Sequence, residues 1–412
     1  MARILLADAD AFFVGVARLA DPEGAGRAPL LIVGGSRDSR GVVCSASYET
    51  RKFGVRSAMP IARALRLCPN AMCVPVPFKG CLAKSVEIRD LLKKFAPVVE
   101  TASVDEWYMD LSGTEGVYHH ESLHTTAQRI RQAVHQATGL TVSIGGGTNK
   151  LIAKLAVDRA KPSANGAGGG IHIVDAGAED AFLRSCTLAD IPLVGPKFQA
   201  RLAARGLVSV EDVLRLNEAA LRQWLSDREA RWLWNRVHGT DGGSVHQRET
   251  ARGLSRDETF SKDLHDDCHI ERELLRLVTR AASDLRGDGL AVRTVAVRIR
   301  DWDFRTRSTQ RTLPEPVISD RVILRVAREL LGSLREARRV PARLVGVRLS
   351  GLLKSWKADQ LSLFTTPGAS GETARDRRLS KAINGVREKF GPKSILPGAL
   401  SALATLRPER HM

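Results

Sequence analysis

Residues 3–13 read Arg-Ile-Leu-Leu-Ala-Asp-Ala-Asp-Ala-Phe-Phe, and this stretch decides the fold. Residues 4–6 form a short apolar run of the kind found in buried strands. Asp8 and Asp10 follow the run directly, so the strand would deliver both carboxylates at its end. Two acids this close to the start also argue against a secretory signal, whose apolar core is uninterrupted.

A second pair of acids follows about one hundred residues later. The segments 98–101 and 107–111 have the composition of strands, and they flank a tight turn that carries Asp105 and Glu106. Carboxylates at the ends of neighbouring strands can converge on one point. If they were left unpaired there, they would repel one another. A divalent cation resolves that repulsion, and hard oxygen ligands favour Mg²⁺ or Mn²⁺. Two such ions can clamp the attacking and leaving oxygens of a phosphoryl transfer.

Each acidic motif is weak when taken singly. The pattern D-x-D also occurs in metal-dependent glycosyltransferases and in helix or turn caps, and an Asp-Glu pair is often plain solvated surface. Both interpretations stay open at this point.

The pattern around these acids predicts an α+β protein. Apolar residues at helical spacing predict helices over 84–95 and 123–137, followed by a strand at 141–144 and a glycine turn at 145–147. Asn149 is placed to cap a further helix that Pro162 ends. The order strand, helix, two strands, helix and strand indicates a split βαβ, or ferredoxin-like, sheet with helices on one face.

The rest of the chain predicts further domains. A glycine-rich break at 166–170 precedes a run of short helices over 188–225, and residues 242–353 mix helix with alternating strands. From Lys354 onward the composition indicates a tail with a short last helix at 381–390. A chain of 412 residues is expected to form two to four domains.

Composition favours a polyanionic partner. The chain has 63 Lys+Arg against 46 Asp+Glu, a net charge of +17, and nucleic acid is the commonest partner of such a protein. None of the 6 cysteines forms a C-x-x-C pair, so neither a zinc site nor a disulfide framework is indicated. No apolar run is long enough to span a bilayer, and a reducing cytoplasm fits these features.

Four blocks occur in order before residue 165. They are residues 3–13; Ser47-Tyr48-Glu49-Thr50-Arg51-Lys52-Phe53-Gly54-Val55 with residues 57–60; residues 100–106 continuing to 108–110; and residues 149–156 ending at Ala160-Lys161-Pro162. In type, order and spacing these blocks resemble the Y family of translesion DNA polymerases, in particular its DinB, or DNA polymerase IV, type. The resemblance extends over about residues 3–400.

The resemblance implies a domain plan for the whole chain. A palm would comprise residues 1–20 and 78–165, fingers 21–77, a helical thumb with a helix-hairpin-helix 166–241, an α/β little finger 242–353, and a C-terminal tail 354–412. It also implies catalytic roles for three acids. Asp8, Asp105 and Glu106 would bind two Mg²⁺ ions, for which Mn²⁺ can substitute, and the backbone carbonyl of Ala9 would be a further ligand.

Other positions correspond to the nucleotide site of the family. Phe13 matches the steric gate, whose ring occupies the space that a ribose 2′-OH would need. Its neighbour Phe12 is counted with the nucleotide-binding residues, although core packing is the preferred explanation for it. The residues that would grip the incoming triphosphate are Tyr48, Arg51 and Lys161, with Ser45 beside them. An arginine can bind phosphate oxygens in a fork, while a lysine acts as a point charge.

Ala9 replaces the bulkier residue usual between the two aspartates, but only its carbonyl is needed. Three other positions also depart from the family pattern. Ala17 stands where many relatives have Glu, Trp107 where many have Ala, and Leu193 where the hairpin usually has its first Gly. The first two are expected to affect the shape of the template pocket, and the third to hinder a contact with DNA.

DNA contacts are predicted at two places. Residues 191–196 resemble a helix-hairpin-helix, in which the backbone N–H groups of Val194 and Gly195 would approach a phosphate; an ordinary helical hairpin explains them equally well. An arginine-rich strand pair in the little finger would track phosphates without reading sequence, through Arg298, Arg300, Arg305 and Arg307. The alternative there is a solvated strand face.

The segment Gln360-Leu361-Ser362-Leu363-Phe364 resembles the peptide that binds the bacterial sliding clamp, the β subunit. Gln360 would bond the rim of a pocket, while Leu361, Leu363 and Phe364 would supply its apolar part. A short buried strand is the alternative interpretation.

Together these features predict a low-fidelity translesion DNA polymerase, a monomer that acts on primer-template DNA and deoxynucleoside triphosphates. The resemblance places it in a bacterial cytoplasm, at the nucleoid. The first alternative is a catalytically inactive relative that binds DNA and recruits partners, against which the intact acids argue. A glycosyltransferase leaves the hairpin and the clamp peptide unexplained, and a nucleotide cyclase leaves Tyr48 and Arg51 unexplained.

Overall fold

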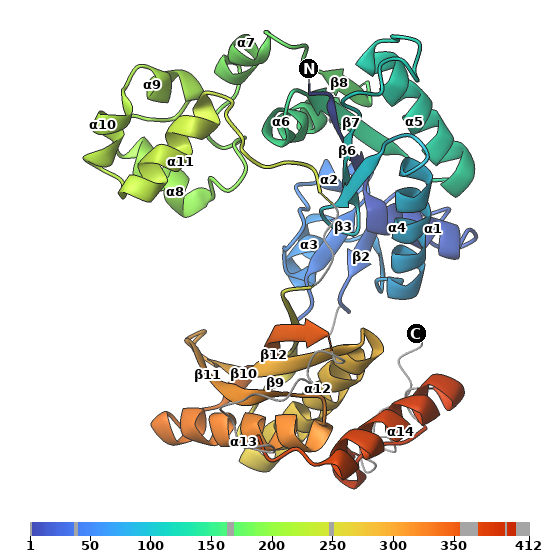
Figure 1. The fold of residues 1–412 in the computed structure, drawn as a ribbon, viewed down its shortest axis with the longest axis vertical. Coiled ribbons are helices and arrows are strands. Elements are labelled where there is room, and N and C mark those ends of the chain that lie inside the picture. Colours follow the sequence, from blue (N-terminus) through green and yellow to red (C-terminus); the bar gives the residue numbers. More distant parts are fainter. Residues whose placement is uncertain are drawn as a thin grey trace. The chain divides into compact units, whose positions relative to one another are not determined.

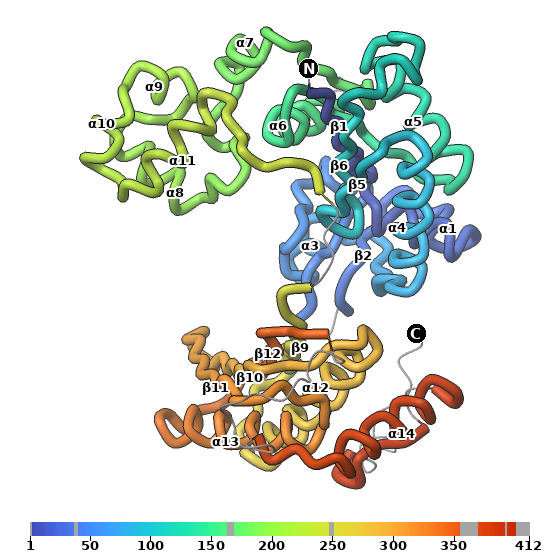
Figure 2. The backbone as a smooth tube through the Cα atoms, in the orientation of Figure 1, coloured from blue at the N-terminus to red at the C-terminus, as the bar shows by residue number. Residues whose placement is uncertain are grey.

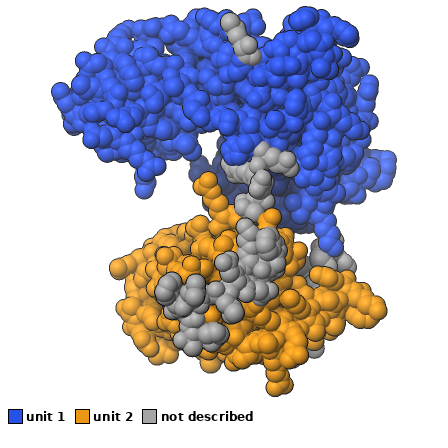
Figure 3. Space-filling view, viewed as in Figure 1, with its two compact units in different colours: residues 1–248 blue, residues 249–412 orange. Residues whose placement is uncertain are grey.

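The computed structural model describes residues 2–36, 40–162, 169–246, 251–354, 370–391 and 394–400. The chain divides into two compact units, Met1–Arg248 and Glu249–Met412, drawn in blue and orange in Figure 3. Within the described residues, no helix is long and apolar enough to cross a membrane.

A five-stranded sheet lies at the centre of the first unit (Figure 1). Its strand order is β5 (Val98–Thr101), β6 (Glu106–Asp110), β1 (Ile4–Ala9), β7 (Val142–Gly147), β8 (Ile171–Ile173). The central strand β1 is antiparallel to both neighbours, and all its residues are buried. This is the split βαβ arrangement that the order of motifs predicts.

The two faces of β1 contact different helices. Leu5, Ala7 and Ala9 share a core with α4 (Phe78–Leu92) and α5 (Leu123–Thr138). Ile4 and Leu6 pack instead against α6 (Lys150–Ala160). Helices therefore cover both faces, whereas the sequence predicts them on one. Because side chains alternate along a strand, Asp8 belongs to the α6 face.

The glycines at 145–147 lie inside β7, so the turn predicted there is wrong. A Cβ on Gly145 would lie 2.1 Å from the backbone nitrogen of Val157 and 2.3 Å from the carbonyl oxygen of Ala153. Glycine is needed because α6 packs directly on the strand, and not because the chain turns. The sheet also continues beyond the predicted palm, since β8 pairs in parallel with β7.

The fingers contain a second small sheet, with β2 (Leu31–Gly34) between β3 (Val43–Ala46) and β4 (Met72–Val74). Helices α1 (Phe12–Ala20), α2 (Tyr48–Arg51) and α3 (Ile61–Leu67) accompany it. Ser47, which is 1% exposed, fixes the start of α2: its Oγ accepts from Thr50 N at 3.3 Å and donates to the Pro29 carbonyl at 2.8 Å. The residues after Ser47 are thereby held at a defined point beside the palm.

The thumb consists of short helices, as predicted. They are α7 (Glu179–Arg184), α8 (Pro196–Ala203), α9 (Val210–Leu214), α10 (Glu218–Arg222) and α11 (Asp227–Val237). Capping boxes at Ser209 and Ser226 begin α9 and α11. Figure 2 follows the chain through these turns in green and yellow.

The second unit is a four-stranded antiparallel sheet covered on one face by two helices. The chain order is β9 (Gly253–Leu264), α12 (Asp267–Gly287), β10 (Leu290–Asp301), β11 (Thr306–Val317), α13 (Asp320–Ala337), β12 (Ala342–Lys354). Val295, Val297 and Ile299 are 0% exposed and share a core with α12 and α13. This confirms the predicted alternation, whose other face carries Arg298 and Arg300.

The C-terminal segment is more ordered than the predicted tail. Helix α14 (Ala374–Phe390) is longer than the helix expected at 381–390 and contacts α12. Just before it, Glu372 Oε1 accepts from Ile318 N at 2.8 Å, and Ser370 Oγ accepts from Glu315 N at 3.1 Å. The predicted clamp peptide, 360–364, lies outside the described residues.

Candidate active site

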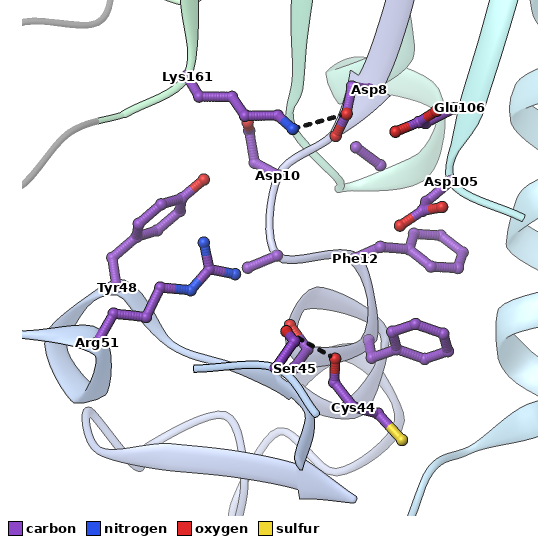
Figure 4. A pocket seen from close by; sticks show the side chains of 14 residues that line it. Asp8, Asp10, Phe12, Cys44, Ser45, Tyr48, Arg51, Asp105, Glu106 and Lys161 are labelled. Atoms are coloured by element: carbon purple, nitrogen blue, oxygen red, sulfur yellow. Dashed lines mark hydrogen bonds and ion pairs between the residues drawn. The ribbon is translucent and has the colours of Figure 1, made fainter. Parts of the chain in front are cut away.

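A pocket of about 180 Å³ lies where the end of β1 meets the fingers (Figure 4). It brings together the residues assigned to metal and nucleotide binding. Its lining residues are Asp8, Ala9, Asp10, Ala11, Phe12, Phe13, Cys44, Ser45, Tyr48, Arg51, Ser57, Asp105, Glu106 and Lys161.

Strand pairing explains how the distant acids reach one pocket. Asp8 lies opposite Glu106 in the β1–β6 ladder. Asp105 immediately precedes β6, and its carbonyl oxygen accepts a hydrogen bond from Ala9 N at 2.9 Å. The backbone register therefore fixes the two acidic motifs beside each other.

Two ammonium groups from α6 and its C-terminal end neutralise these carboxylates. Lys161 Nζ lies 2.7 Å from Asp8 Oδ2 (Figure 4). Lys154 Nζ lies 2.7 Å from Glu106 Oε1 and 3.5 Å from Asp8 Oδ2. Asp105 has a different partner, because its Oδ1 accepts a hydrogen bond from Ser103 Oγ.

Burial and these ion pairs have opposite effects on the pKa values of Asp8 and Glu106. Burial raises the pKa of Asp8 to about 6, although Lys161 and Lys154 act to lower it. Burial also acts to raise the pKa of Glu106, but the hydrogen bond and charge of Lys154 outweigh it, so this pKa is lowered. The pKa of Lys161 is raised, because the pairing with Asp8 exceeds the effect of burial.

The donor set suits Mg²⁺, since three carboxylates offer hard oxygen ligands. In this conformation, the described residues contain no group of three His, Cys, Asp or Glu side chains close enough to hold a metal ion. Positive charge is supplied instead by Lys154 and Lys161, whose ammonium groups contact the acids where cations would bind. A divalent cation that bound these carboxylates would have to displace Lys154 and Lys161 from them.

The nucleotide side of the pocket is built from α2. Figure 4 shows Tyr48 and Arg51 extending from this helix across the pocket from the carboxylates. Arg51 Nε donates to the Ala46 carbonyl at 2.9 Å, and its guanidinium lies 4.7 Å from the centroid of the Tyr48 ring. Ser45, 5% exposed, lines the pocket beside them.

The two phenylalanines differ in their surroundings. Phe12 is 2% exposed and belongs to the palm core, in agreement with the packing interpretation. Phe13 is half-buried, and its ring lies edge-on to that of Phe12 at 5.6 Å. Before them, Ala11 adopts a left-handed conformation with φ of 45°, which turns the chain sharply from β1 into α1.

Lys154 and Asp10 received no role from sequence. Lys154 was visible only as part of a motif, although Lys150, Lys154 and Lys161 recur at intervals of four and seven and so share one side of α6 and its extension. Asp10 lines the pocket and accepts a hydrogen bond from Ser143 Oγ at 2.7 Å. The helical phase of the lysines was the signal that could have identified Lys154.

Two of the residues predicted to contact DNA have partners within the protein. Val194 is 4% exposed and its N–H donates to the Ile191 carbonyl at 3.1 Å, so that the hairpin itself uses this group. Arg307 lies opposite the core residue Ile299, on the helix-covered side, and pairs with fully buried Asp301 at 2.9 Å. Gly195 begins α8 as its N-cap and stays a predicted contact.

The remaining arginines lie at the open side of the sheet or at its end. Arg298 and Arg300 alternate with core residues of β10, and Arg298 contacts Asp257 at 2.5 Å while its side chain is 45% exposed. Arg305, in the connection from β10 to β11, is exposed. These three stay predicted phosphate contacts.

The family departures have different surroundings. Ala17 and Trp107 are 5% and 0% exposed, and neither lines the pocket, so they change packing behind it. Leu193 is 83% exposed with φ of 74°, a conformation that glycine would adopt more easily.

Comparisons with known proteins identify the family. Residues 7–158 match the impB/mucB/samB family, and residues 251–363 match its C-terminal domain. A DNA polymerase IV of Dehalococcoides mccartyi (strain CBDB1) is 32% identical over 396 residues, which cover 96% of this chain and 97% of the relative. A DNA polymerase IV of Halorhodospira halophila is 35% identical over 364 residues, 88% of this chain and 99% of the relative.

Solved structures give the same result. A Y-family DNA polymerase chimera has a TM-score of 0.74 at 25% identity, over 85% of this chain and 99% of its own. DinB from Sulfolobus solfataricus has a TM-score of 0.56 at 26% identity, over 84% of this chain and 98% of its own. With near-complete coverage of relatives above 30% identity, the chain belongs to the Y-family DNA polymerases, of the DNA polymerase IV (DinB) type.

Proposed function

We propose that this chain adds deoxynucleotides to a primer 3′-OH by phosphoryl transfer assisted by two divalent cations, and that it copies damaged templates. One observation carries the proposal. A single pocket is lined by Asp8, Asp105 and Glu106 and, across from them, by the Tyr48–Arg51 pair, with Phe13 also in its lining. This arrangement offers separate places for metal, triphosphate and sugar.

Asp8, Asp105 and Glu106 would hold the cations through their carboxylate oxygens, with the carbonyl oxygen of Ala9 as a further ligand. When bound, such ions lower the pKa of the primer hydroxyl and neutralise the charge that develops on the pyrophosphate. The protein supplies position: β1 and β6 hold Asp8 and Glu106 opposite each other in one ladder, so these ligands would be in place before the transfer.

The side chains on α2 and after α6 would bind the triphosphate. Arg51 presents a guanidinium whose Nε is already fixed by the Ala46 carbonyl, which leaves its terminal nitrogens to contact phosphate oxygens. Lys161 adds a mobile ammonium group. The Phe13 ring would exclude a 2′-OH by occupying its volume.

The second unit would hold the duplex. Arg298, Arg300 and Arg305 carry positive charge toward phosphates without contacting base edges, which suits a polymerase that must accept any sequence. Recruitment by the sliding clamp through residues 360–364 completes the proposal.

Isosteric substitution of the acids tests the chemistry. Asp8→Asn and Glu106→Gln keep size and remove the charge that would bind metal, so primer extension should fall by about a thousandfold or more. Extension of a labelled primer with Mg²⁺, and separately Mn²⁺, measures this.

Asp110→Asn is the matched control, because Asp110 lies at the other end of β6 and its carboxylate accepts from Ser112 N at 2.9 Å. It should extend primers like the unaltered protein. All three variants should bind primer-template DNA normally. If Asp8→Asn or Glu106→Gln kept the full extension rate, the assignment of the acids would be wrong.

A further inference from the structure

Helix α14 buries polar side chains where most helices bury apolar ones. Ser380, Asn384 and Arg387 are 5%, 9% and 8% exposed and recur at i, i+4 and i+7, which places them on one face. Asn384 Oδ1 accepts from Arg286 Nη2 at 2.8 Å and from Ser283 Oγ at 3.3 Å. Hydrogen bonds to α12 therefore hold the helix on its polar face.

The apolar side chains of α14 are consequently left outside. Leu379, Ile383, Val386 and Phe390 recur at intervals of four, three and four residues and form one stripe, called here the α14 stripe. Leu379, Val386 and Phe390 are 57%, 36% and 67% exposed, and Ile383 is half-buried. An exposed apolar stripe at helical spacing is typical of a surface that another molecule covers.

The charges beside the stripe indicate what covers it. At 100° per residue, Arg375, Arg378 and Lys389 lie along the edge of the stripe that is remote from the docked face, and all three are exposed. Within the described part of the chain, no ion pair of these three cations with a carboxylate is found. Lys389 Nζ lies 5.3 Å from the centroid of the Phe390 ring, so charge and apolar surface adjoin.

These features select one kind of occupant. DNA would satisfy the cations but leave the apolar stripe in water. A second copy of α14 would bring like charges against Arg375, Arg378 and Lys389. We propose that the α14 stripe is a docking surface for an acidic amphipathic segment of a partner protein, whose apolar residues cover the stripe and whose carboxylates pair with the three cations.

A binding experiment with the full chain tests both halves of this proposal. The probe is a fluorescein-labelled helical peptide of about 20 residues with leucines on one face bordered by glutamates, followed by fluorescence anisotropy. A matched peptide has lysines in place of the glutamates. The acidic peptide should bind at least about tenfold more tightly than the basic one.

Variants then assign the binding to the stripe. Phe390→Ser should lower the affinity for the acidic peptide by about tenfold, the effect of removing one large apolar anchor. Arg378→Glu should lower the affinity for the acidic peptide and raise the affinity for the basic one. Val208→Ser, in the thumb, removes an equally exposed apolar residue (61%) and should change neither affinity. All variants should keep the thermal stability and primer extension of the unaltered protein.

Several results would overturn the proposal. The two peptides could bind equally, or Phe390→Ser could leave the acidic peptide unaffected. Sedimentation could show a dimer that Phe390→Ser dissociates, which would assign the stripe to a second copy. Flotation with phosphatidylserine vesicles, lost in the same variant, would assign it to lipid. If the peptide bound only after removal of residues 401–412, the occupant would be the chain's own C-terminus.

Discussion

At the residue scale, the ionisation of the Asp8 carboxyl group has the clearest consequence for the pocket. Its side chain is 8% exposed, and the ammonium groups of Lys161 and Lys154 lie within 2.7 and 3.5 Å. Burial nevertheless prevails, and its pKa is raised from 3.8 to about 6. The negative charge of Asp8 is therefore unfavourable in the free protein. A bound cation would compensate this charge, which would make Asp8 a suitable metal ligand.

The raised pKa predicts how stability changes with pH. Between pH 3.8 and about 6 the unfolded chain releases the Asp8 proton while the folded chain keeps it. The free energy of unfolding should therefore fall as pH rises through this window, by roughly 3 kcal/mol at most, and stay lower above it. Asp8→Asn cannot ionise and should lack this fall.

Urea unfolding in EDTA, at pH values below, within and above the window, measures the difference between Asp8→Asn and the unaltered protein. The variant should gain stability relative to the unaltered protein as pH rises. Parallel curves for the two proteins would show that Asp8 ionises normally in the folded state.

Phe13 predicts sugar selectivity. Phe13→Ala would vacate the volume next to the nucleotide, so that ribonucleotides should be incorporated at least about tenfold more readily relative to deoxynucleotides. Primer extension with each nucleotide class measures the ratio. Phe12→Ala is the matched control: it should lower stability by about 3 kcal/mol because Phe12 is 2% exposed, and leave the ratio unchanged.

At the scale of helices and strands, most of the palm could be predicted from sequence, because its elements are marked by patterns of neighbouring residues. Buried strands such as β1 carry continuous apolar runs, and α5 shows its apolar side chains at helical spacing. Gly145 was misinterpreted because a glycine inside a strand has no side chain to mark it. Its true role, the close approach of α6, depends on a residue twelve positions away, which no local pattern contains.

The candidate active site was likewise predictable where motifs mark it and unpredictable where packing decides it. Motifs identified Asp8, Asp105, Glu106, Tyr48 and Arg51, and the structure places all five around one pocket. Lys154 was not predicted as a partner of the acids, because its contacts follow from the packing of α6 on β1. The Ser103 hydrogen bond to Asp105 likewise depends on the geometry of a turn.

The β10–β11 hairpin predicts opposite effects for two arginines. Arg298 is on the open face, so Arg298→Ala should weaken DNA binding uniformly across sequences and reduce the salt slope by about one. Arg307 pairs with buried Asp301, which Arg338 also contacts at 2.6 Å, so Arg307→Ala should lower stability by roughly 1–3 kcal/mol with little effect on the salt slope.

Filter binding at several salt concentrations and thermal unfolding separate the two effects. If Arg307→Ala bound DNA more weakly at temperatures where the variant remains folded, Arg307 would have to leave Asp301 and contact DNA.

At the scale of the whole molecule, the chain consists of two units, and the second continues beyond β12. Lys354 ends β12, and Ser370 and Glu372 are again hydrogen-bonded to the second unit. The proposed clamp peptide, residues 360–364, lies between these two points in the sequence. Its position predicts that it can be removed without disturbing either unit.

Deletion of residues 360–364 should leave primer extension in the absence of clamp unchanged and abolish its stimulation by the β clamp. Extension on a primed circular template, with and without clamp, measures this. Deletion of a neighbouring pentapeptide, residues 365–369, controls for length. Stimulation that survives the first deletion would require another clamp contact.

The pairing of Lys161 with Asp8 has a consequence for the order of ligand binding. One ammonium group cannot neutralise Asp8 and a triphosphate at full strength simultaneously, so a nucleotide that attracts Lys161 would expose the carboxylate to a cation. Nucleotide and cation would then bind cooperatively, and thermodynamic reciprocity requires each to raise the affinity of the other by the same factor. Without ligands, Lys161 would keep Asp8 neutralised, and a nucleotide and a cation bound together would take over both charges of this pair.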